Sequence, residues 1–315
     1  MKVKLINVVY ILLFYTATFA QKKEISNKQT QEHIFVGGTK VAMIPPQDFI
    51  KATAFSGFQQ PETNASIMIS ELPAPYSVLL KNFTAENLKT RGMELLNKEE
   101  ITFQGQPAVI YKAKQSAQGV LFVKYILVFG DEKGVVMLNG IFPESEINLE
   151  ESIKKALYSS IYQQDKVVNP LGDAPFQIDL EGSNLKFANA ISGMLLFTSD
   201  GFAPVKSTDK AFFSVGQAIS SVIIIDKKQF VLDRLKSLPN GNKIKVENTE
   251  EISIDGMPGY TINAWGEDDQ GKKELVYQTI LFVDNTYYIM VGLASNDFEK
   301  YSERFKKVAQ TFKRK

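Results

Sequence analysis

The feature that most constrains the fold of this chain is an internal repeat. Residues 99–113 (EEITFQGQPAVIYKA) and 250–264 (EEISIDGMPGYTINA) share six identities at a constant shift of 151. By chance, about one match in fifteen positions is expected from average residue frequencies. The order of the following apolar runs also agrees, because 125–130 (YILVFG) corresponds to 279–284 (TILFVD), and 136–140 (VMLNG) to 289–292 (IMVG). The repeat indicates two copies of one structural unit.

Both copies carry the same Gly-x-Pro pattern inside the repeat. Gly105 and Gly256 can adopt the positive φ that a tight hairpin turn requires, and Asp255 before Gly256 is a favoured turn residue. Pro107 and Pro258 are tolerated only at a sheet edge or at the start of a strand. The pattern therefore predicts a structural hairpin turn in each copy, rather than a binding site.

Apolar periodicity predicts an α+β unit. In the first copy, a strand over 41–44 ends at two prolines, and apolar spacing between Tyr76 and Met93 predicts one or two helices, with Thr84 suited to cap the second. Further strands are expected at 65–69, 101–113, 120–129 and 135–141, the last three forming an antiparallel meander. Leu149, Ile153, Leu157 and Ile161 then recur every four residues and predict a closing helix that packs on the sheet.

The second copy repeats the meander and closes with the apolar stripe Phe298, Tyr301, Phe305, Val308 and Phe312. The first strands and helix of the second copy are less clear in the sequence. We expect residues 220–225 (SSVIII) to correspond to the strand at 65–69, followed by a short helix over 230–236. The strand count of this copy stays open.

The N-terminal segment indicates export. Lys2 and Lys4 precede an apolar run from Leu5 to Tyr15, and Ala20 stands at a position suited to signal-peptidase cleavage, so 1–20 is predicted to be a secretory signal peptide. The expected division of the remaining chain is a flexible leader at 21–33, a first domain at 34–162, a linker at 163–175 and a second domain at 176–315. We expect a periplasmic or extracellular protein without stable membrane insertion.

Charge and cysteine content exclude several classes of function. Removing Lys2 and Lys4 leaves 36 − 2 = 34 basic side chains against 35 acidic ones, a balance that gives no electrostatic footprint for nucleic acid. Zero cysteines exclude thiol nucleophiles, zinc thiolate sites and lipid attachment through cysteine. We expect no cofactor.

The order of these elements resembles the Mog1/PsbP-like domain, including its exported DcrB-like branch. The likeness rests on the proline-ended opening strand, the helical segment, the turns at 105–107 and 256–258, and the final amphipathic helix. It implies two tandem domains, each an antiparallel sheet flanked by helices, which serve mainly in docking or assembly. It implies no common active site, so no site residues follow from it.

The motifs of common catalytic and metal sites are absent or isolated. The only histidine, His33, falls in the predicted leader and is expected to be a solvated tail residue, which leaves no histidine for a triad or a multi-histidine metal site. Ser-x-x-Lys occurs at 152–155 and 207–210 without its companion motifs, as expected by chance. Carboxylates cluster at 131–132, 144–146 and 267–269 in predicted loops, where solvated charge is more common than a calcium site or an acid–base pair.

Trp265 is the single tryptophan and the one candidate for partner binding. It follows the second hairpin strand and precedes an acidic loop, although half-buried packing is the commoner role of such a residue. Taken together, the sequence favours a non-catalytic binding or assembly protein that engages an envelope or secreted protein. The alternatives are a carrier of a lipid or other apolar ligand, suggested by 22 Phe and 12 Tyr, and a hydrolase that uses carboxylates alone.

Overall fold

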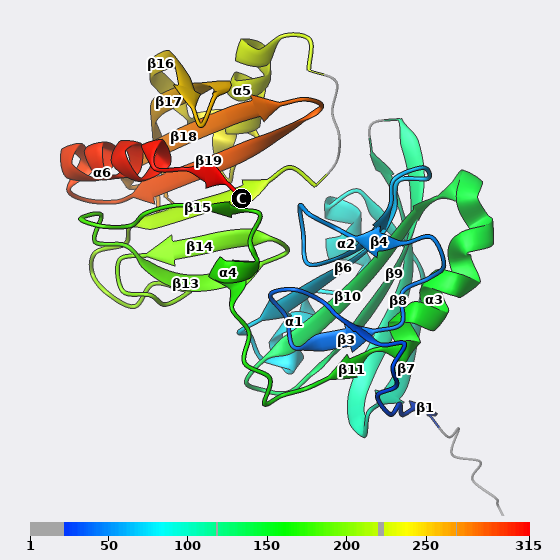
Figure 1. Cartoon of the computed structure of the whole chain (residues 1–315). Coiled ribbons are helices and arrows are strands. Elements are labelled where there is room, and N and C mark those ends of the chain that lie inside the picture. Colours follow the sequence, from blue (N-terminus) through cyan, green and yellow to red (C-terminus); the bar gives the residue numbers. More distant parts are fainter. Residues whose placement is uncertain (1–21, 118, 220–223, 269) are drawn as a thin grey trace, which may run out of the picture.

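The computed structural model describes residues 22–117, 119–219, 224–268 and 270–315, in which two large β-sheets are covered by helices (Figure 1). One sheet is built from the first half of the chain and the other from the second half. All strand pairs are antiparallel except one at the edge of the first sheet, so the fold class is α+β. Among these residues, no helix is long and apolar enough to cross a bilayer.

The first sheet has eight strands in the order β1-β7-β8-β9-β10-β6-β5-β4. Its strands are β1 (Lys23–Ile25), β4 (Ile50–Lys51), β5 (Gly57–Gln60), β6 (Ala65–Leu72), β7 (Met93–Phe103), β8 (Gln106–Ala117), β9 (Val120–Gly130) and β10 (Val135–Pro143). The predicted antiparallel meander is confirmed, but the single strand expected over 101–113 is wrong, because the predicted turn at Gln104–Gly105 divides this run into β7 and β8.

The second sheet has seven strands in the order β13-β14-β15-β19-β18-β17-β16. Its strands are β13 (Lys186–Ile191), β14 (Met194–Thr198), β15 (Phe212–Gln217), β16 (Lys245–Ile254), β17 (Met257–Glu267), β18 (Lys273–Val283) and β19 (Thr286–Ala294). The two sheets have the same strand order: β4-β5-β6-β10-β9-β8-β7 in the first corresponds to β13-β14-β15-β19-β18-β17-β16 in the second. Among the described residues, β1 alone has no counterpart in the second sheet.

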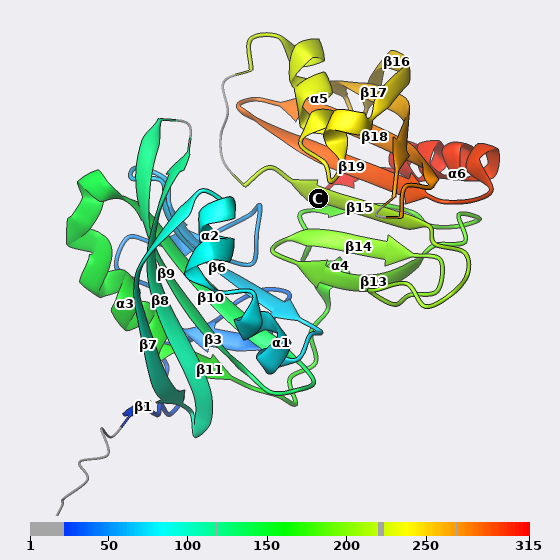
Figure 2. The same cartoon turned by 180° about the vertical axis from the view of Figure 1, so that it is seen from behind.

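Helices cover both faces of each sheet, which explains why long runs of consecutive residues in β9 and β18 are buried, without the alternation of a half-exposed strand. In the first sheet, α3 (Glu150–Ser159) lies on one face, and α1 (Tyr76–Lys81) and α2 (Ala85–Thr90) lie on the other (Figure 2). In the second sheet, α6 (Phe298–Gln310) and α5 (Lys227–Lys236) take the corresponding faces. The remaining short helices are η1 (Glu144–Leu149), α4 (Pro170–Asp173) and η2 (Gly241–Lys243).

Local signals in the sequence correctly located two features. Thr84 caps α2, where its side chain accepts a hydrogen bond of 3.2 Å from the Asn87 N–H. Both Gly-x-Pro turns are two-residue hairpin loops with two positive φ angles, 51° and 75° at Gln104–Gly105 and 50° and 73° at Asp255–Gly256. This geometry matches the right-handed twist of the flanking strands, so it sets the register of β7 with β8 and of β16 with β17.

The closing helices approach the sheets at a glycine in each half. Gly140 on β10 lies directly under Ile153 of α3, and a Cβ added at Gly140 would collide with that side chain. Gly292 on β19 lies under the Phe305 ring of α6, whose nearest carbon would be 2.5 Å from an added Cβ. The absence of a side chain lets both helices pack onto the strand itself, and the space between sheet and helix is filled.

A short strand after each closing helix is held by the hairpin turn. β11 (Ile161–Tyr162) pairs with β3 (Val41–Met43), which also pairs with β2 (Ile34–Phe35), and β12 (Phe176–Gln177) pairs with β20 (Lys313–Arg314). The Tyr162 N–H donates to the Gln104 side chain at 3.4 Å. In the second half, the Arg314 N–H donates to the Asp255 carboxylate at 3.1 Å. Thus the same turn position fixes the same segment in both halves.

Two sequence expectations fail. The predicted leader 21–33 is not uniformly unstructured, because β1 adds in parallel to β7, with Lys23, Glu24 and Ile25 opposite residues 101–103. Backbone pairing and burial of Ile25 against the core compensate for the polar composition of this segment. The strand that corresponds to β6 is β15, since β15 pairs with β19 as β6 pairs with β10. Residues 220–223 of the expected strand, and the predicted signal peptide, lie outside the described residues.

Replacing Gly292 by Ala tests the close packing of α6. We expect Gly292→Ala to lower the free energy of unfolding by about 1–3 kcal/mol, because the new methyl group overpacks against Phe305. The matched control is Gly134→Ala, whose Cβ would meet only the Leu72 carbonyl oxygen at 3.5 Å and should change stability by less than about 0.5 kcal/mol. Urea denaturation measures both, and equal effects would contradict this account.

Candidate functional site

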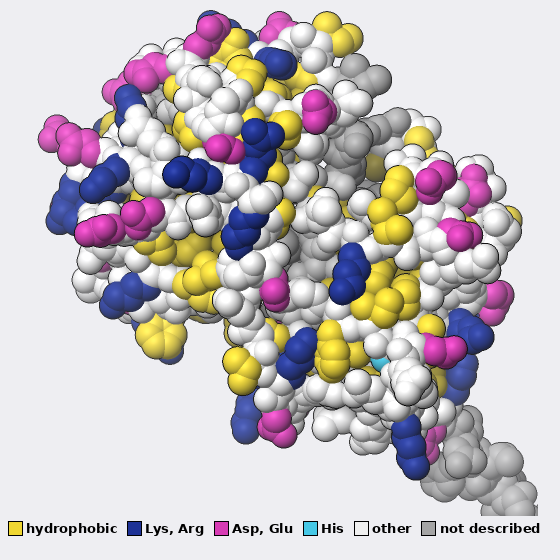
Figure 3. Space-filling model, viewed as in Figure 1, with side chains coloured by type: hydrophobic (Ala, Val, Ile, Leu, Met, Phe, Trp, Pro, Cys, Tyr) yellow, Lys and Arg dark blue, Asp and Glu magenta, His cyan; other side chains and the backbone are white. Residues whose placement is uncertain are grey.

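The second half of the chain contacts the first half through the turn between β13 and β14. Gly193 in this turn has φ of 84°, and a Cβ there would lie 2.7 Å from the Cα of Phe55. The turn is therefore in direct contact with the backbone of the first half. The Ser192 hydroxyl forms a 2.6 Å hydrogen bond with the Ser70 hydroxyl on β6. Beside this contact the surface is hollowed where the two parts of the molecule meet (Figure 3).

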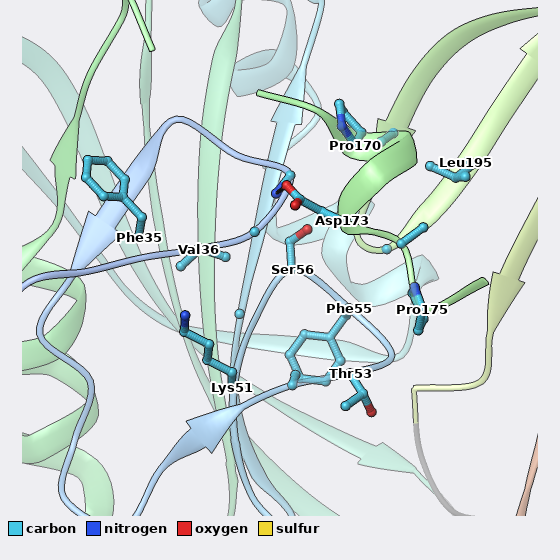
Figure 4. Close-up of a pocket in the computed structure, with 17 residues that line it drawn as sticks. Phe35, Val36, Lys51, Thr53, Phe55, Ser56, Pro170, Asp173, Pro175 and Leu195 are labelled. Carbon is cyan, nitrogen blue, oxygen red and sulfur yellow. Dashed lines mark hydrogen bonds between the residues drawn. The ribbon is translucent and has the colours of Figure 1, made fainter. Parts of the chain in front are cut away.

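A small pocket of about 270 Å³, here called the seam pocket, lies at this contact. Figure 4 shows Asp173 of α4 reaching the loop that carries Val36, with Ser56 and Phe55 on the neighbouring loop. The Asp173 carboxylate accepts a 2.7 Å hydrogen bond from the Gly38 N–H. Since the acidic side chain of the seam pocket is already bound to the backbone, this pocket is best explained by the packing of the two halves.

A larger cavity of about 490 Å³ opens at the end of the first sheet, and we call it the Tyr162 pocket. It lies between β11, the end of β6 and the β7–β8 and β9–β10 turns. Its apolar lining includes Phe103, Phe129, Val136 and Tyr162, and its polar lining includes Lys40, Glu71, Gln104, Asp131, Lys133 and Gln164. Aromatic walls with a few polar groups at the rim are typical of sites that bind ligands or anchor side chains.

The aromatic walls are positioned by packing among themselves. The Phe129 ring lies 4.8 Å from that of Phe103, and Tyr162 meets Phe129 edge-on at 6.2 Å between centroids. Phe103 and Phe129 belong to the buried core, whereas Tyr162 is only partly buried. Burial raises the pKa of the Tyr162 hydroxyl above its ordinary value, so this phenol is neutral at physiological pH. The pocket therefore presents one amphipathic ring at its opening.

Glu71 is the half-buried acid of the pocket. Its carboxylate accepts a 2.6 Å hydrogen bond from the Lys40 N–H, and the Lys40 ammonium donates to the Gln164 carbonyl at 2.6 Å. Burial raises the pKa of the Glu71 carboxyl above its ordinary 4.5, although the Lys40 hydrogen bond and the charges of Lys40 and Lys166 oppose this. Ionisation of Glu71 is therefore less favourable in this half-buried position than in water.

Asp131 lines the same cavity in a different environment. Its carboxylate accepts hydrogen bonds from the N–H groups of Lys133 and Gly134, at 2.7 and 3.1 Å, and these hold the pKa of the carboxyl below its usual value. Asp131 therefore has a structural role in the β9–β10 turn. Even so, the pocket contains two carboxylates whose pKa values are shifted in opposite directions, a pattern found at acid–base sites.

Trp265 lies outside both pockets. It is half-buried on β17, meets the Phe298 ring edge-on at 5.2 Å between centroids, and has the Lys273 ammonium 3.6 Å from its ring centroid. The ring packs against the core of the second sheet. These contacts account for the tryptophan structurally, and its role in partner binding stays a prediction.

His33 is not the solvated tail residue that the sequence suggested. Its Nδ1 accepts from the Thr30 N–H at 3.0 Å, and its Nε2 lies 2.9 Å from the Ser159 carbonyl oxygen at the end of α3. With Nδ1 as acceptor, Nε2 carries the proton and donates to that carbonyl. His33 therefore ties the segment after β1 to the closing helix.

The other motifs weighed in the sequence have ordinary structural partners. The Ser152 and Ser207 hydroxyls each donate to a backbone carbonyl, those of Leu149 and Asp209. In the acidic loop, Glu267 pairs with Lys243 at 2.8 Å and Asp268 accepts backbone N–H groups, while Asp269 lies outside the described residues. No group of three or more metal-ligating side chains occurs in the part of the chain that the structure describes.

Sequence reasoning did not find the Tyr162 pocket. Its residues come from segments as far as a hundred positions apart or more, such as Lys40 and Tyr162, and no local spacing connects them. Asp131 was noted only as part of a solvated loop. The internal repeat predicted the hairpin turn at Gln104, but it did not indicate that this turn borders a cavity.

Comparison with known proteins gives structural likenesses only. No protein-family model and no curated protein sequence matches the chain. Among solved structures, it is similar to cyanobacterial PsbP from Synechocystis (15% identity, 39% of this chain and 87% of that one, TM-score 0.29). LpqN of Mycobacterium tuberculosis, involved in cell envelope biogenesis, matches at 12% identity over 44% of this chain and 82% of that one, with a TM-score of 0.32.

A third likeness extends over most of the chain. The type VI secretion immunity protein TplEi of Pseudomonas aeruginosa matches at 12% identity over 90% of this chain and 97% of that one, with a TM-score of 0.30. At TM-scores of this size, none of these likenesses assigns a fold or a function to the chain. The α+β class rests on its own sheets and helices.

The buried carboxyl of Glu71 predicts a specific pH dependence. Because its folded pKa is above the unfolded 4.5, the folded state binds more protons in the interval between these values, and stability falls as pH rises through it. We expect Glu71→Gln to raise the urea midpoint at pH 7 and to leave it unchanged below pH 4.5. The side-chain oxygen of Gln keeps the hydrogen bond from Lys40. A variant less stable than wild type at pH 7 would contradict the predicted direction.

Proposed function

We propose that this chain is an exported, non-catalytic binding or assembly protein whose partner is an envelope or secreted protein. We also propose that it consists of two tandem Mog1/PsbP-like domains, at 34–162 and 176–315, joined by the segment 163–175 after removal of a signal peptide at 1–20. The common strand order of the two sheets supports the duplication. The predicted signal sequence supports export to the periplasm or beyond.

The observation that carries the proposal is the Tyr162 pocket. It combines apolar walls with a rim of both charge signs, given by Lys40, Glu71 and Lys133. A protein partner can place an apolar side chain against the aromatic wall of the pocket and meet the rim with polar groups, which is the usual anatomy of an interface anchor. Figure 3 supports a surface of this mixed kind, since basic and acidic side chains are interspersed over the face shown.

The packing of the closing helices argues against a lipid held between sheet and helix. Gly140 and Gly292 bring α3 and α6 into direct contact with the strands, which leaves no room for an acyl chain there. The Tyr162 pocket itself has the charged groups of Lys40 and Glu71 in its lining, which an apolar ligand would shield from water without offering them a hydrogen bond. Native mass spectrometry of the purified chain distinguishes the two proposals, because a lipid carrier retains its lipid.

A carboxylate-based hydrolase is the second candidate. It is supported by the presence of Glu71 and Asp131 in one cavity with pKa values shifted apart. Against it, both carboxylates already accept backbone hydrogen bonds that hold local structure. Chromogenic ester, phosphate and glycoside substrates test it directly. Hydrolysis lost in both Glu71→Gln and Asp131→Asn would establish an enzyme and overturn the non-catalytic proposal.

Tyr162→Ala tests partner binding. We expect it to weaken binding of the partner, recovered by pull-down of the tagged mature chain from its own envelope, by roughly tenfold, because an interface anchor loses its aromatic wall. Phe230→Ala is the matched control, since Phe230 is half-buried against Phe282 and Tyr287 on the other sheet. Biolayer interferometry measures both affinities, and circular dichroism confirms the fold of each variant.

Two results would reject the proposal. One is the repeated recovery of no envelope or secreted protein by the wild-type chain. The other is an equal affinity of wild type and Tyr162→Ala for the recovered protein, which would leave the pocket without a role in binding.

A further inference from the structure

The two sheets differ at one edge. In the first sheet, the outer edge of β7 is occupied by β1, whose Lys23, Glu24 and Ile25 lie opposite residues 101–103 in parallel pairing. The Gln104 N–H extends this pairing by donating to the Ile25 carbonyl at 2.7 Å. In the second sheet, β16 has the place of β7, and no strand pairs with its outer edge among the described residues. The pairing of β1 with β7 in the first half therefore shows how a strand can pair with the open edge of β16 in the second half.

The two edges have the same local geometry. The shift of 151 places Ile252–Ile254 at the position of Ile101–Phe103, and Asp255 at the position of Gln104. Both edge strands carry a bulge at the corresponding point, between Leu95 and Asn97 in β7 and between Val246 and Asn248 in β16. The turn that ends each strand binds the segment after the closing helix in the same way. In the second half, the Arg314 guanidinium also donates to the Asp255 carboxylate and carbonyl, at 3.1 and 3.3 Å, so the shared geometry extends along the strand up to this turn.

The end of β16 lacks the protection that edge strands normally have. Bulges and charged side chains discourage pairing with foreign strands, and β16 has both near Glu247. Its last three residues, Ile252–Ile254, carry no charge and no bulge. Ser253 is exposed, and its N–H points away from β17, because the opposite residue Pro258 has no N–H with which to form a hydrogen-bonded pair.

The charge beside this edge indicates which segment it accepts. In the first sheet, Lys22 next to β1 pairs with Glu100 at 2.8 Å. The corresponding residue in the second sheet is Glu251, which is exposed and accepts a 3.0 Å hydrogen bond from the Tyr260 hydroxyl. Glu251 retains a carboxylate oxygen for a cation. Charge complementarity therefore favours a basic residue of the partner at this point.

We propose that the outer edge of β16 at Ile252–Ile254 binds an extended segment of a partner protein in parallel β-pairing. The segment carries a basic residue beside Glu251 and, three positions later, an apolar residue beside Ile254. Lys22, which precedes β1, and Ile25 in β1 have these places in the first sheet. This inference rests on the proposed function, since it assigns the partner's contact to a second site. Main-chain hydrogen bonds supply the affinity, and the two side chains supply the selection.

A synthetic peptide with the sequence of residues 21–28 (QKKEISNK) is a suitable probe, because it contains the β1 strand and its basic residue. We expect a fluorescein-labelled form to bind the full mature chain saturably, as measured by fluorescence anisotropy. Ser253→Pro removes the outward N–H without disturbing the pairing with β17, and should weaken binding by roughly tenfold. Glu251→Lys should weaken it similarly, whereas Glu247→Lys, the same charge change outside the binding register, should have little effect.

The outcomes separate this inference from the proposed function. No saturable binding of the peptide, or equal binding by wild type and a folded Ser253→Pro variant, overturns the inference. If the protein recovered from the envelope binds Ser253→Pro as tightly as wild type but Tyr162→Ala more weakly, the proposed function stands and the β16 contact is rejected. A dimer of the chain that Ser253→Pro dissociates in light scattering would assign the edge to a second copy and also overturn the inference.

Discussion

The close approach of the closing helices to the sheets is the contact on which the rest of the structure depends. Gly140 and Gly292 are positions where the sheet has no side chain, and Ile153 and Phe305 fill that space from the helix side. Each helix then covers the central strands and directs the chain back toward the hairpin turn. The turn residues Gln104 and Asp255 bind the returning segment, so one packing contact fixes strand, helix and turn together.

Because the core between each sheet and its closing helix is filled, the surfaces available for binding lie at the ends and edges of the sheets. The interior between sheet and helix is filled, and the Tyr162 pocket lies instead at the end of the first sheet, where β11 and two turns do not close completely. The other feature is the outer edge of β16, whose counterpart in the first half, the edge of β7, is covered by β1. The open edge of β16 is a difference between two similar halves.

The parts of the fold that were predictable are those governed by short-range rules. The Gly-x-Pro turns require positive φ, Thr84 suits a helix cap, and the stripe through Ile153 and Leu157 requires a buried helix face. Prediction failed where pairing is decided at long range. The apolar composition of 220–225 favoured a strand beside β19, yet β15 occupies that place. The polar segment 21–33 looked unable to order itself, yet an open strand edge gives its backbone a partner.

By itself, the sequence determined that the chain contains two related α+β units, where their turns and closing helices lie, and that thiol and multi-histidine chemistry is excluded. Only the tertiary structure decided which residues meet. Lys40, Glu71 and Tyr162 share a cavity because three separate segments meet at the same rim, and the burial that raises the pKa of Glu71 exists only after they come together. The physical reason is that local periodicity fixes the face on which a side chain lies, whereas sheet order and register fix its neighbours.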